Sequence, residues 1–71
     1  MDLKNSLLIK FGIKLREFRK EKGLSQEKLA HLAGLHRTYI GMIERAEKNI
    51  TLLNVEKISN ALKIKITEFF D

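Results

Sequence analysis

Four side chains that can contact base edges or phosphates are spaced at helical intervals in the middle of the sequence. They are Arg37, Thr38, Met42 and Arg45. At 3.6 residues per turn they fall, together with Gly41, within an arc of about 140° on one side of a helix. Arginine can bind O6 and N7 of guanine with two hydrogen bonds, and threonine or methionine can contact the methyl group of thymine. This combination is typical of a face that reads the major groove of DNA.

The other side of the same segment is apolar, because Ile40 and Ile43 point away from the arginines. We therefore expect a helix over about Arg37–Arg45 with one packed side and one exposed side. Gly41 costs such a helix about 1 kcal/mol relative to alanine. On the exposed side, its missing side chain would let the helix backbone approach DNA. The alternative interpretation is an ordinary solvated face with a tolerated glycine.

A second helix and a tight turn precede this segment and determine its position. Ser25 can cap a helix that continues to about Ala33, because its hydroxyl can accept a free backbone N–H. Gly34 can then adopt the positive φ that a tight turn requires. A small residue, a glycine four positions later and apolar residues six and nine positions beyond it form the helix-turn-helix pattern, over about residues 26–45. The positions concerned are Ala30, Gly34, Ile40 and Ile43.

Helical periodicity also organises the rest of the chain, which has no proline and no convincing alternating segment typical of a strand. We expect a first helix over about Ser6–Lys22 and a fourth helix that begins after Thr51 as its N-cap. The buried stripe of the fourth helix is expected to be Leu52, Val55, Ile58 and Leu62. A short last helix, capped by Thr67, is expected over residues 66–70. The sequence therefore predicts an all-α fold of five helices.

Length and composition limit the chain, residues 1–71, to one domain and to a few classes of function. There are 14 Lys and Arg against 9 Asp and Glu, and the net charge of +5 favours a polyanionic partner. The absence of cysteine excludes disulfides and thiol chemistry, and two histidines alone cannot form a metal site. No apolar run is long enough to span a bilayer, and the first residues lack the pattern of a signal peptide. We therefore expect a cytoplasmic protein without membrane contact, metal, cofactor or enzymatic activity.

The segments Gly23–Ala30 and Arg37–Arg45, with Gly34 between them, resemble the Cro/repressor-type (Xre-like) helix-turn-helix family. The resemblance covers about residues 8–70. Within that family, the size of the chain and the run Arg37–Arg45 are most similar to the controller proteins of restriction–modification systems. The resemblance implies a compact, lambda-repressor-like fold and a protein that binds double-stranded DNA.

The resemblance also implies DNA-contacting roles for nine residues. Those that would read bases are His36, Arg37, Thr38 and Met42. Those that would contact the sugar–phosphate backbone are Gln26, Tyr39, Arg45, Lys48 and Asn49. The position of Gln26 independently suits phosphate, because the free N–H groups and dipole of a helix N-terminus attract anions. His36 departs from the Ser, Thr or Asp common in the family, so it either caps the helix weakly or faces DNA.

Two further sets of residues are implied to hold the structure together. Arg19 and Glu44 match a pair that forms a partly buried salt bridge and positions the DNA-reading helix. The C-terminal segment is rich in apolar residues, and in controller proteins it makes the two-fold contact of a homodimer. The candidates are Ile64, Ile66, Phe69 and Phe70. Such a dimer would place two reading helices about 34 Å apart, which is one turn of DNA.

These observations favour a sequence-specific transcriptional regulator of the controller type that binds a pseudo-palindromic operator as a homodimer. An activating member would also contact RNA polymerase, for which Glu27 and Lys28 are candidates by analogy. Within the family, the alternative is an antitoxin or a phage-type repressor. Outside it, the alternative is a protein-interaction module that uses the same fold, and such a module should lack a basic reading face.

Overall fold

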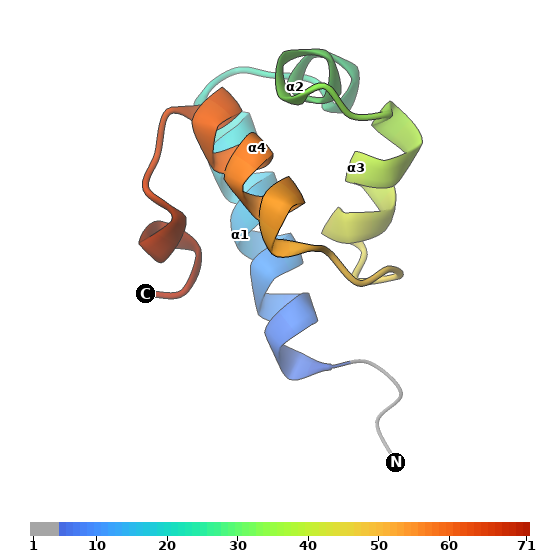
Figure 1. Ribbon diagram of the computed structural model, residues 1–71, viewed down its shortest axis with the longest axis vertical. Coiled ribbons are helices and arrows are strands. Elements are labelled where there is room, and N and C mark those ends of the chain that lie inside the picture. The colour runs from blue at the N-terminus through green and yellow to red at the C-terminus, as the bar shows by residue number, and fades with distance from the viewer. Residues whose placement is uncertain (1–4) are drawn as a thin grey trace.

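The computed structural model describes residues 5–71 as four α-helices followed by one short 3₁₀-helix (Figure 1). In chain order these are α1 (Ser6–Glu21), α2 (Gln26–Ala33), α3 (Arg37–Glu44), α4 (Leu52–Leu62) and η1 (Ile66–Phe69). The described part of the chain contains no strand and no helix long and apolar enough to cross a membrane. The expected all-helical fold is confirmed, but its last element is a 3₁₀ turn rather than a fifth α-helix.

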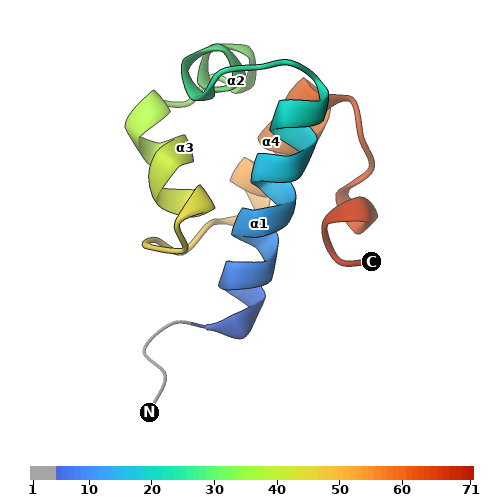
Figure 2. The ribbon, with the colours of Figure 1, turned by 180° about the vertical axis from the view of Figure 1, so that it is seen from behind.

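The helices are arranged so that α3 is supported from two directions. The α2 helix crosses one end of the molecule. The α3 helix and the η1 turn lie on opposite sides of the α1 and α4 helices (Figure 1; Figure 2 shows the same from behind). Packing is most extensive between α2 and α3, and α3 also packs on α1. By contrast, α3 and α4 approach each other little. The position of α3 therefore depends mainly on α1 and α2.

Each of the five elements contributes at least one fully buried side chain to a common core. These residues include Leu15, Leu29, Ile40, Ile58 and Phe69. Burying an aliphatic or aromatic side chain of this size stabilises the folded state by about 1.5–3 kcal/mol. The ring of Phe69 lies against Phe11 and Phe18 of α1, with centroids 4.5 and 5.5 Å apart. The short η1 turn therefore closes the core.

The helix ends expected from single residues are confirmed at α2 and α4. Ser25 Oγ accepts the backbone N–H of Lys28 at 3.0 Å, and Thr51 Oγ1 accepts that of Asn54 at 3.1 Å. Gly34 follows α2 with φ of 71° in the left-handed region, which an L side chain rarely adopts. The turn between α2 and α3 therefore has the geometry that the sequence predicts.

Two expectations about the second half of the chain are wrong. Thr67 does not cap the last turn, because the turn begins at Ile66 and its N-cap is Lys65, whose N–H donates to the Glu68 carboxylate at 2.8 Å. Leu52 is not part of the buried stripe of α4, since 85% of it is exposed. It is the first residue of α4, and the buried face of that helix begins only at Val55.

Gly12 makes the close contact between α1 and α3 possible. A Cβ atom at this position would lie 2.6 Å from the carbonyl oxygen of Ile43 and 2.7 Å from that of Glu44. Both obstacles are backbone atoms at the end of α3, so they cannot rotate away as a side chain can. The two helices can pack at this distance only because position 12 has no side chain.

We expect Gly12→Ala to lower the free energy of unfolding by about 1–3 kcal/mol, because the added methyl group overpacks the α1–α3 contact. Gly41→Ala is the matched control: it too is a buried helical glycine, but a Cβ there would meet side-chain ends, with Arg45 Nη1 at 3.1 Å. Urea unfolding followed by circular dichroism measures both changes. Equal stability of the two variants would contradict the role given to Gly12.

Candidate nucleic-acid interface

The α3 helix has one buried side and one exposed side, as its sequence predicts. Ile40 and Ile43 are buried in the core, whereas Arg37 and Thr38 at its first turn are exposed. Met42, one turn later, is half-buried. The structure thus places three of the four expected base-reading residues, His36, Arg37 and Thr38, together at the exposed start of α3.

His36 is the N-cap of α3 and is exposed at the same time. Its Nδ1 accepts the backbone N–H of Thr38 at 3.1 Å. Because Nδ1 acts as an acceptor, the ring proton of the neutral imidazole is on Nε2, which leaves Nε2–H as a hydrogen-bond donor. The two alternatives for His36, capping the helix and facing outward, are therefore compatible.

Arg37 pairs with Glu27 of α2 across the turn. The guanidinium Nη1 lies 3.7 Å from Glu27 Oε2, and both side chains are largely exposed. An exposed pair of this kind contributes little to stability, about 0–1 kcal/mol. Arg37 can therefore leave Glu27 for a base edge at small cost.

The proposed role of Gly41 is wrong, because this glycine is buried and does not belong to the exposed face. Its nearest neighbours are the side-chain ends of Arg45 and Gln26. The start of α2 lies against this part of α3 and covers it. Gly41 therefore makes room for the side chain of Gln26 rather than for DNA.

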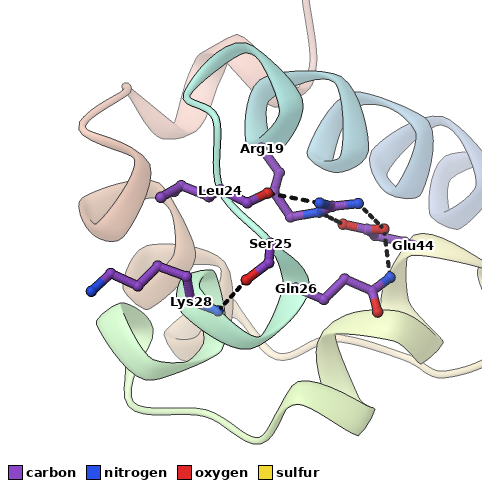
Figure 3. A network of polar contacts seen from close by, with 6 residues as sticks. All are labelled: Arg19, Leu24, Ser25, Gln26, Lys28 and Glu44. Atoms are coloured by element: carbon purple, nitrogen blue, oxygen red, sulfur yellow. Dashed lines mark hydrogen bonds and ion pairs between the residues drawn. The ribbon is translucent and has the colours of Figure 1, made fainter.

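A network of polar contacts lies where α1, α2 and α3 meet (Figure 3). Arg19 Nε donates to Glu44 Oε2 at 2.6 Å and Arg19 Nη2 to Oε1 at 3.2 Å. Arg19 Nη1 donates to the carbonyl oxygen of Leu24 at 2.8 Å. The Glu44 side chain is only 4% exposed and that of Arg19 11%. The two residues thus form a largely buried, two-pronged ion pair that joins α1 to the end of α3.

Gln26 belongs to the same network. Its Nε2 donates to Glu44 Oε1 at 3.0 Å, and the residue is half-buried. The sequence suggests only a phosphate contact for Gln26, since nothing local indicates a carboxylate from α3 beside it. The structure adds a positioning role, while the first backbone N–H groups of α2 still lack intrahelical partners and can attract an anion.

The other residues expected at the DNA backbone lie in or after α3. Tyr39 is half-buried, packs against the core and accepts a hydrogen bond from Asn54 of α4. Arg45 is exposed, and its Nε lies 3.1 Å from Glu47 Oε1. Lys48 and Asn49 are exposed in the segment between α3 and α4. Tyr39 therefore lies in the first turn of α3, whereas Arg45, Lys48 and Asn49 place basic and polar groups at its end and beyond it.

The C-terminal residues expected at a dimer contact differ in their exposure. Phe69 is fully buried in the core of its own protomer, so its assignment to an interface is corrected: it offers no surface to a second copy. Ile64 is half-buried against the core. Ile66 and Phe70 are exposed to 39% and 43%.

Two exposed leucines were missed as candidates for such a contact. Leu53 is 70% exposed beside Leu52, and both lie in the first turn of α4. Adjacent residues of a helix point about 100° apart, so two neighbouring leucines cannot both face one narrow core. That local signal could have identified at least one of them as a surface residue.

The fold and this arrangement define a helix-turn-helix protein. The sequence profile of the helix-turn-helix family matches residues 15–69, and the chain belongs to that family. It is 47% identical to control protein C.BamHI of Bacillus amyloliquefaciens over 68 residues, 94% of this chain and 84% of that protein. Among solved structures, it resembles the restriction–modification controller protein C.AhdI from Aeromonas hydrophila with a TM-score of 0.90 and 50% identity, covering 93% of this chain and all of the other. It also resembles SinR, a master regulator for biofilm formation solved in complex with DNA (TM-score 0.82, 34% identity, 86% and 98% covered).

No group of three or more His, Asp or Glu side chains within residues 5–71 is placed to hold a metal ion. The exposed and half-buried side chains of α3 and its N-cap include hydrogen-bond donors, a methyl-bearing hydroxyl, a thioether and a cationic group. These are the groups that read base edges and phosphates.

Glu44→Gln should lower the free energy of unfolding by about 3–5 kcal/mol, because it leaves the Arg19 charge buried without its carboxylate. Glu47→Gln removes the carboxylate of an exposed pair and should change stability by less than about 1 kcal/mol. Thermal and urea unfolding of both variants provide the comparison. If Glu44→Gln proves as stable as Glu47→Gln, the buried pair does not hold α3 in place.

Proposed function

We propose that this protein is a sequence-specific transcriptional regulator of the restriction–modification controller type that binds DNA as a homodimer. The observation that carries the proposal is the exposure of the start of α3 on a helix that is packed in the core. Its exposed side bears His36, Arg37 and Thr38, while its other side is anchored in the core. The likeness to control proteins and to a regulator solved with DNA supports the same assignment.

In the proposed complex, α3 lies in the major groove. Arg37 binds a guanine through its two-pronged guanidinium, and Thr38 and Met42 contact a thymine methyl group. His36 can donate from Nε2 to a base acceptor. These contacts supply sequence preference, because each donor and acceptor pattern in the major groove belongs to one base pair.

Phosphate contacts flank this base-reading surface in the same proposal. The N-terminus of α2 at Gln26 provides one of them, and Tyr39, Arg45, Lys48 and Asn49 provide the others. The net charge of +5 favours association with the polyanion, and displacement of counterions makes the affinity salt-dependent. Phosphate contacts fix the register of α3 on the duplex without carrying sequence information.

A second copy of the chain would complete the binding unit. Ile66 and Phe70 remain candidates for the contact, and the exposed Leu52 and Leu53 are added to them. Ile64, which is half-buried against the core, would contribute its exposed part. A two-fold dimer would set its α3 helices about 34 Å apart and match half-sites about 10 base pairs apart. A domain of this size also gains stability by burying apolar surface between copies.

The protein would act in the cytoplasm and would control transcription by occupying its operator. A controller of this type would act on its own gene and on a neighbouring endonuclease gene, repressing from one site and activating from another. RNA polymerase is the partner that activation requires, with Glu27 and Lys28 on the exposed side of α2 as candidate contacts. Neither a catalytic activity nor a cofactor is part of this proposal.

An antitoxin or phage-type repressor would use the same surface, and the likeness to control proteins over nearly the whole chain favours the controller type. The protein-interaction module is disfavoured by a specific observation: Arg37 and Arg45 are both exposed around α3. A surface kept for protein contacts alone would not need cations at these positions.

Selection of bound sequences from a random duplex library at about 150 mM salt tests the proposal, at an ionic strength where non-specific electrostatic binding is weakened. We expect enrichment of a two-fold symmetric site with half-sites about one helical turn apart. Salt-sensitive binding without any enriched sequence would reject sequence-specific recognition and leave a general DNA-binding domain. The same selection with Arg37→Ala should yield a site that has lost its preference at one base pair of each half-site.

Leu53→Ser should weaken self-association, because it removes an exposed apolar group from the candidate dimer surface while leaving the core intact. Leu32→Ser is the matched control, since Leu32 is a similarly exposed leucine on α2. Sedimentation velocity over a range of concentrations should show a lower dimer fraction for Leu53→Ser only. An unchanged dimer in this variant would exclude the first turn of α4 from the interface.

A further inference from the structure

Asn54 and Tyr39 form a hydrogen bond between two helices that otherwise approach each other little. Tyr39 is in the first turn of α3 and Asn54 in the first turn of α4. Asn54 Nδ2 donates to the Tyr39 hydroxyl at 2.9 Å, and both residues are half-buried. Since the backbones of α3 and α4 make few direct contacts, this bond is a specific bridge between them.

The backbone of Asn54 is held in place independently of its bond to Tyr39. Its backbone N–H is bound by the Oγ1 of Thr51, the N-cap of α4, at 3.1 Å. Its neighbour in sequence, Val55, is buried in the core. The carboxamide therefore projects from a fixed helix start, and a short side chain with two torsions has little freedom from there.

The direction of the hydrogen bond decides what the Tyr39 hydroxyl can do next. A phenolic oxygen has one proton to donate and lone pairs to accept with. The Asn54 amide occupies a lone pair, so the hydroxyl proton remains available to another acceptor. Accepting a hydrogen bond also polarises the O–H group and makes it a better donor. The Tyr39 ring packs against the core, which restricts the ring while Asn54 restricts the hydroxyl.

We propose that Asn54 is a positioning residue for DNA binding, which orients the Tyr39 hydroxyl as a hydrogen-bond donor to an oxygen of the DNA backbone. This inference rests on the proposed function and extends it to a residue that belongs to no part of the helix-turn-helix segment. Asn54 touches no DNA in this mechanism and acts through Tyr39. It also joins the DNA-contacting helix to the turn of α4 that carries Leu52 and Leu53.

A double-mutant cycle tests whether Asn54 acts through the hydroxyl. The four proteins are the wild type, Asn54→Ala, Tyr39→Phe and the double variant, and the affinity for the selected operator is measured by fluorescence anisotropy of a labelled duplex. Each single substitution should weaken binding about three- to tenfold, the value of one hydrogen bond. The double variant should bind no more weakly than Tyr39→Phe alone, because Asn54 has no target once the hydroxyl is gone.

Asn60→Ala is the control for the loss of an asparagine from α4, since Asn60 is exposed on the same helix. It should bind the operator as the wild type does. Thermal unfolding of every variant separates weaker binding from a smaller folded fraction. If Asn54→Ala binds like Asn60→Ala, or if the losses of the two single variants multiply in the double variant, the positioning role is overturned.

A spectroscopic measurement tests the bridge without DNA. Tyr39 is the only tyrosine in the sequence and there is no tryptophan, so the intrinsic fluorescence reports on this one ring. Asn54→Ala should change the Tyr39 emission and Asn60→Ala should not. An emission unaffected by Asn54→Ala would refute the hydrogen bond itself. Failure of the wild type to select any operator would instead refute the proposed function and leave the fluorescence result standing.

Discussion

The carboxylate of Glu44 is the point at which three helices of this protein are held together. It accepts two hydrogen bonds from Arg19 of α1 and one from Gln26 at the start of α2, although it belongs to α3. A buried charge is costly unless its partners are present and well oriented, so the network tolerates few arrangements of these helices. Gly12 permits the same junction sterically, because it lets the α1 backbone approach the end of α3. The ion pair and the close backbone packing thus both hold the end of α3 against α1.

The consequence for function is that α3 is a rigid support with a polar outer surface. Its inner side is fixed by Ile40 and Ile43, its end by Glu44, and its beginning by the His36 cap. Recognition of a base edge requires donors and acceptors placed to a fraction of an ångström, which a mobile segment does not provide. The buried ion pair, the close contact at Gly12 and part of the core therefore converge on the helix that the proposed function needs.

The distribution of apolar surface shows how the protein uses its limited size. One core is built from all five elements, and Phe69 of the last turn is fully buried in it. The large apolar groups left outside include those of the first turn of α4 and the C-terminal turn. In the proposed dimer, these groups are covered by a second copy, and the Tyr39–Asn54 bond connects their helix to α3. The helix that takes part in dimerisation would then be bonded directly to the helix that contacts DNA.

The sequence by itself determined the features that depend on neighbouring residues. The N-caps Ser25 and Thr51, the left-handed Gly34 and the apolar side of α3 follow from local hydrogen bonding, backbone sterics and helical periodicity. The Arg19–Glu44 pair also came from the sequence, but through a family resemblance, because 25 positions separate its members.

Only the tertiary structure decided which surfaces meet. It showed that Gly41 is covered by Gln26, that Leu52 is exposed while Phe69 is buried, and that Asn54 reaches Tyr39. Periodicity indicates the side of a helix that is apolar, yet it does not indicate where a helix enters the core or which polar groups from other helices lie beside it. Those facts depend on packing between distant segments. A local pattern such as two adjacent leucines indicates that at least one of them lies at the surface, but it does not indicate which one.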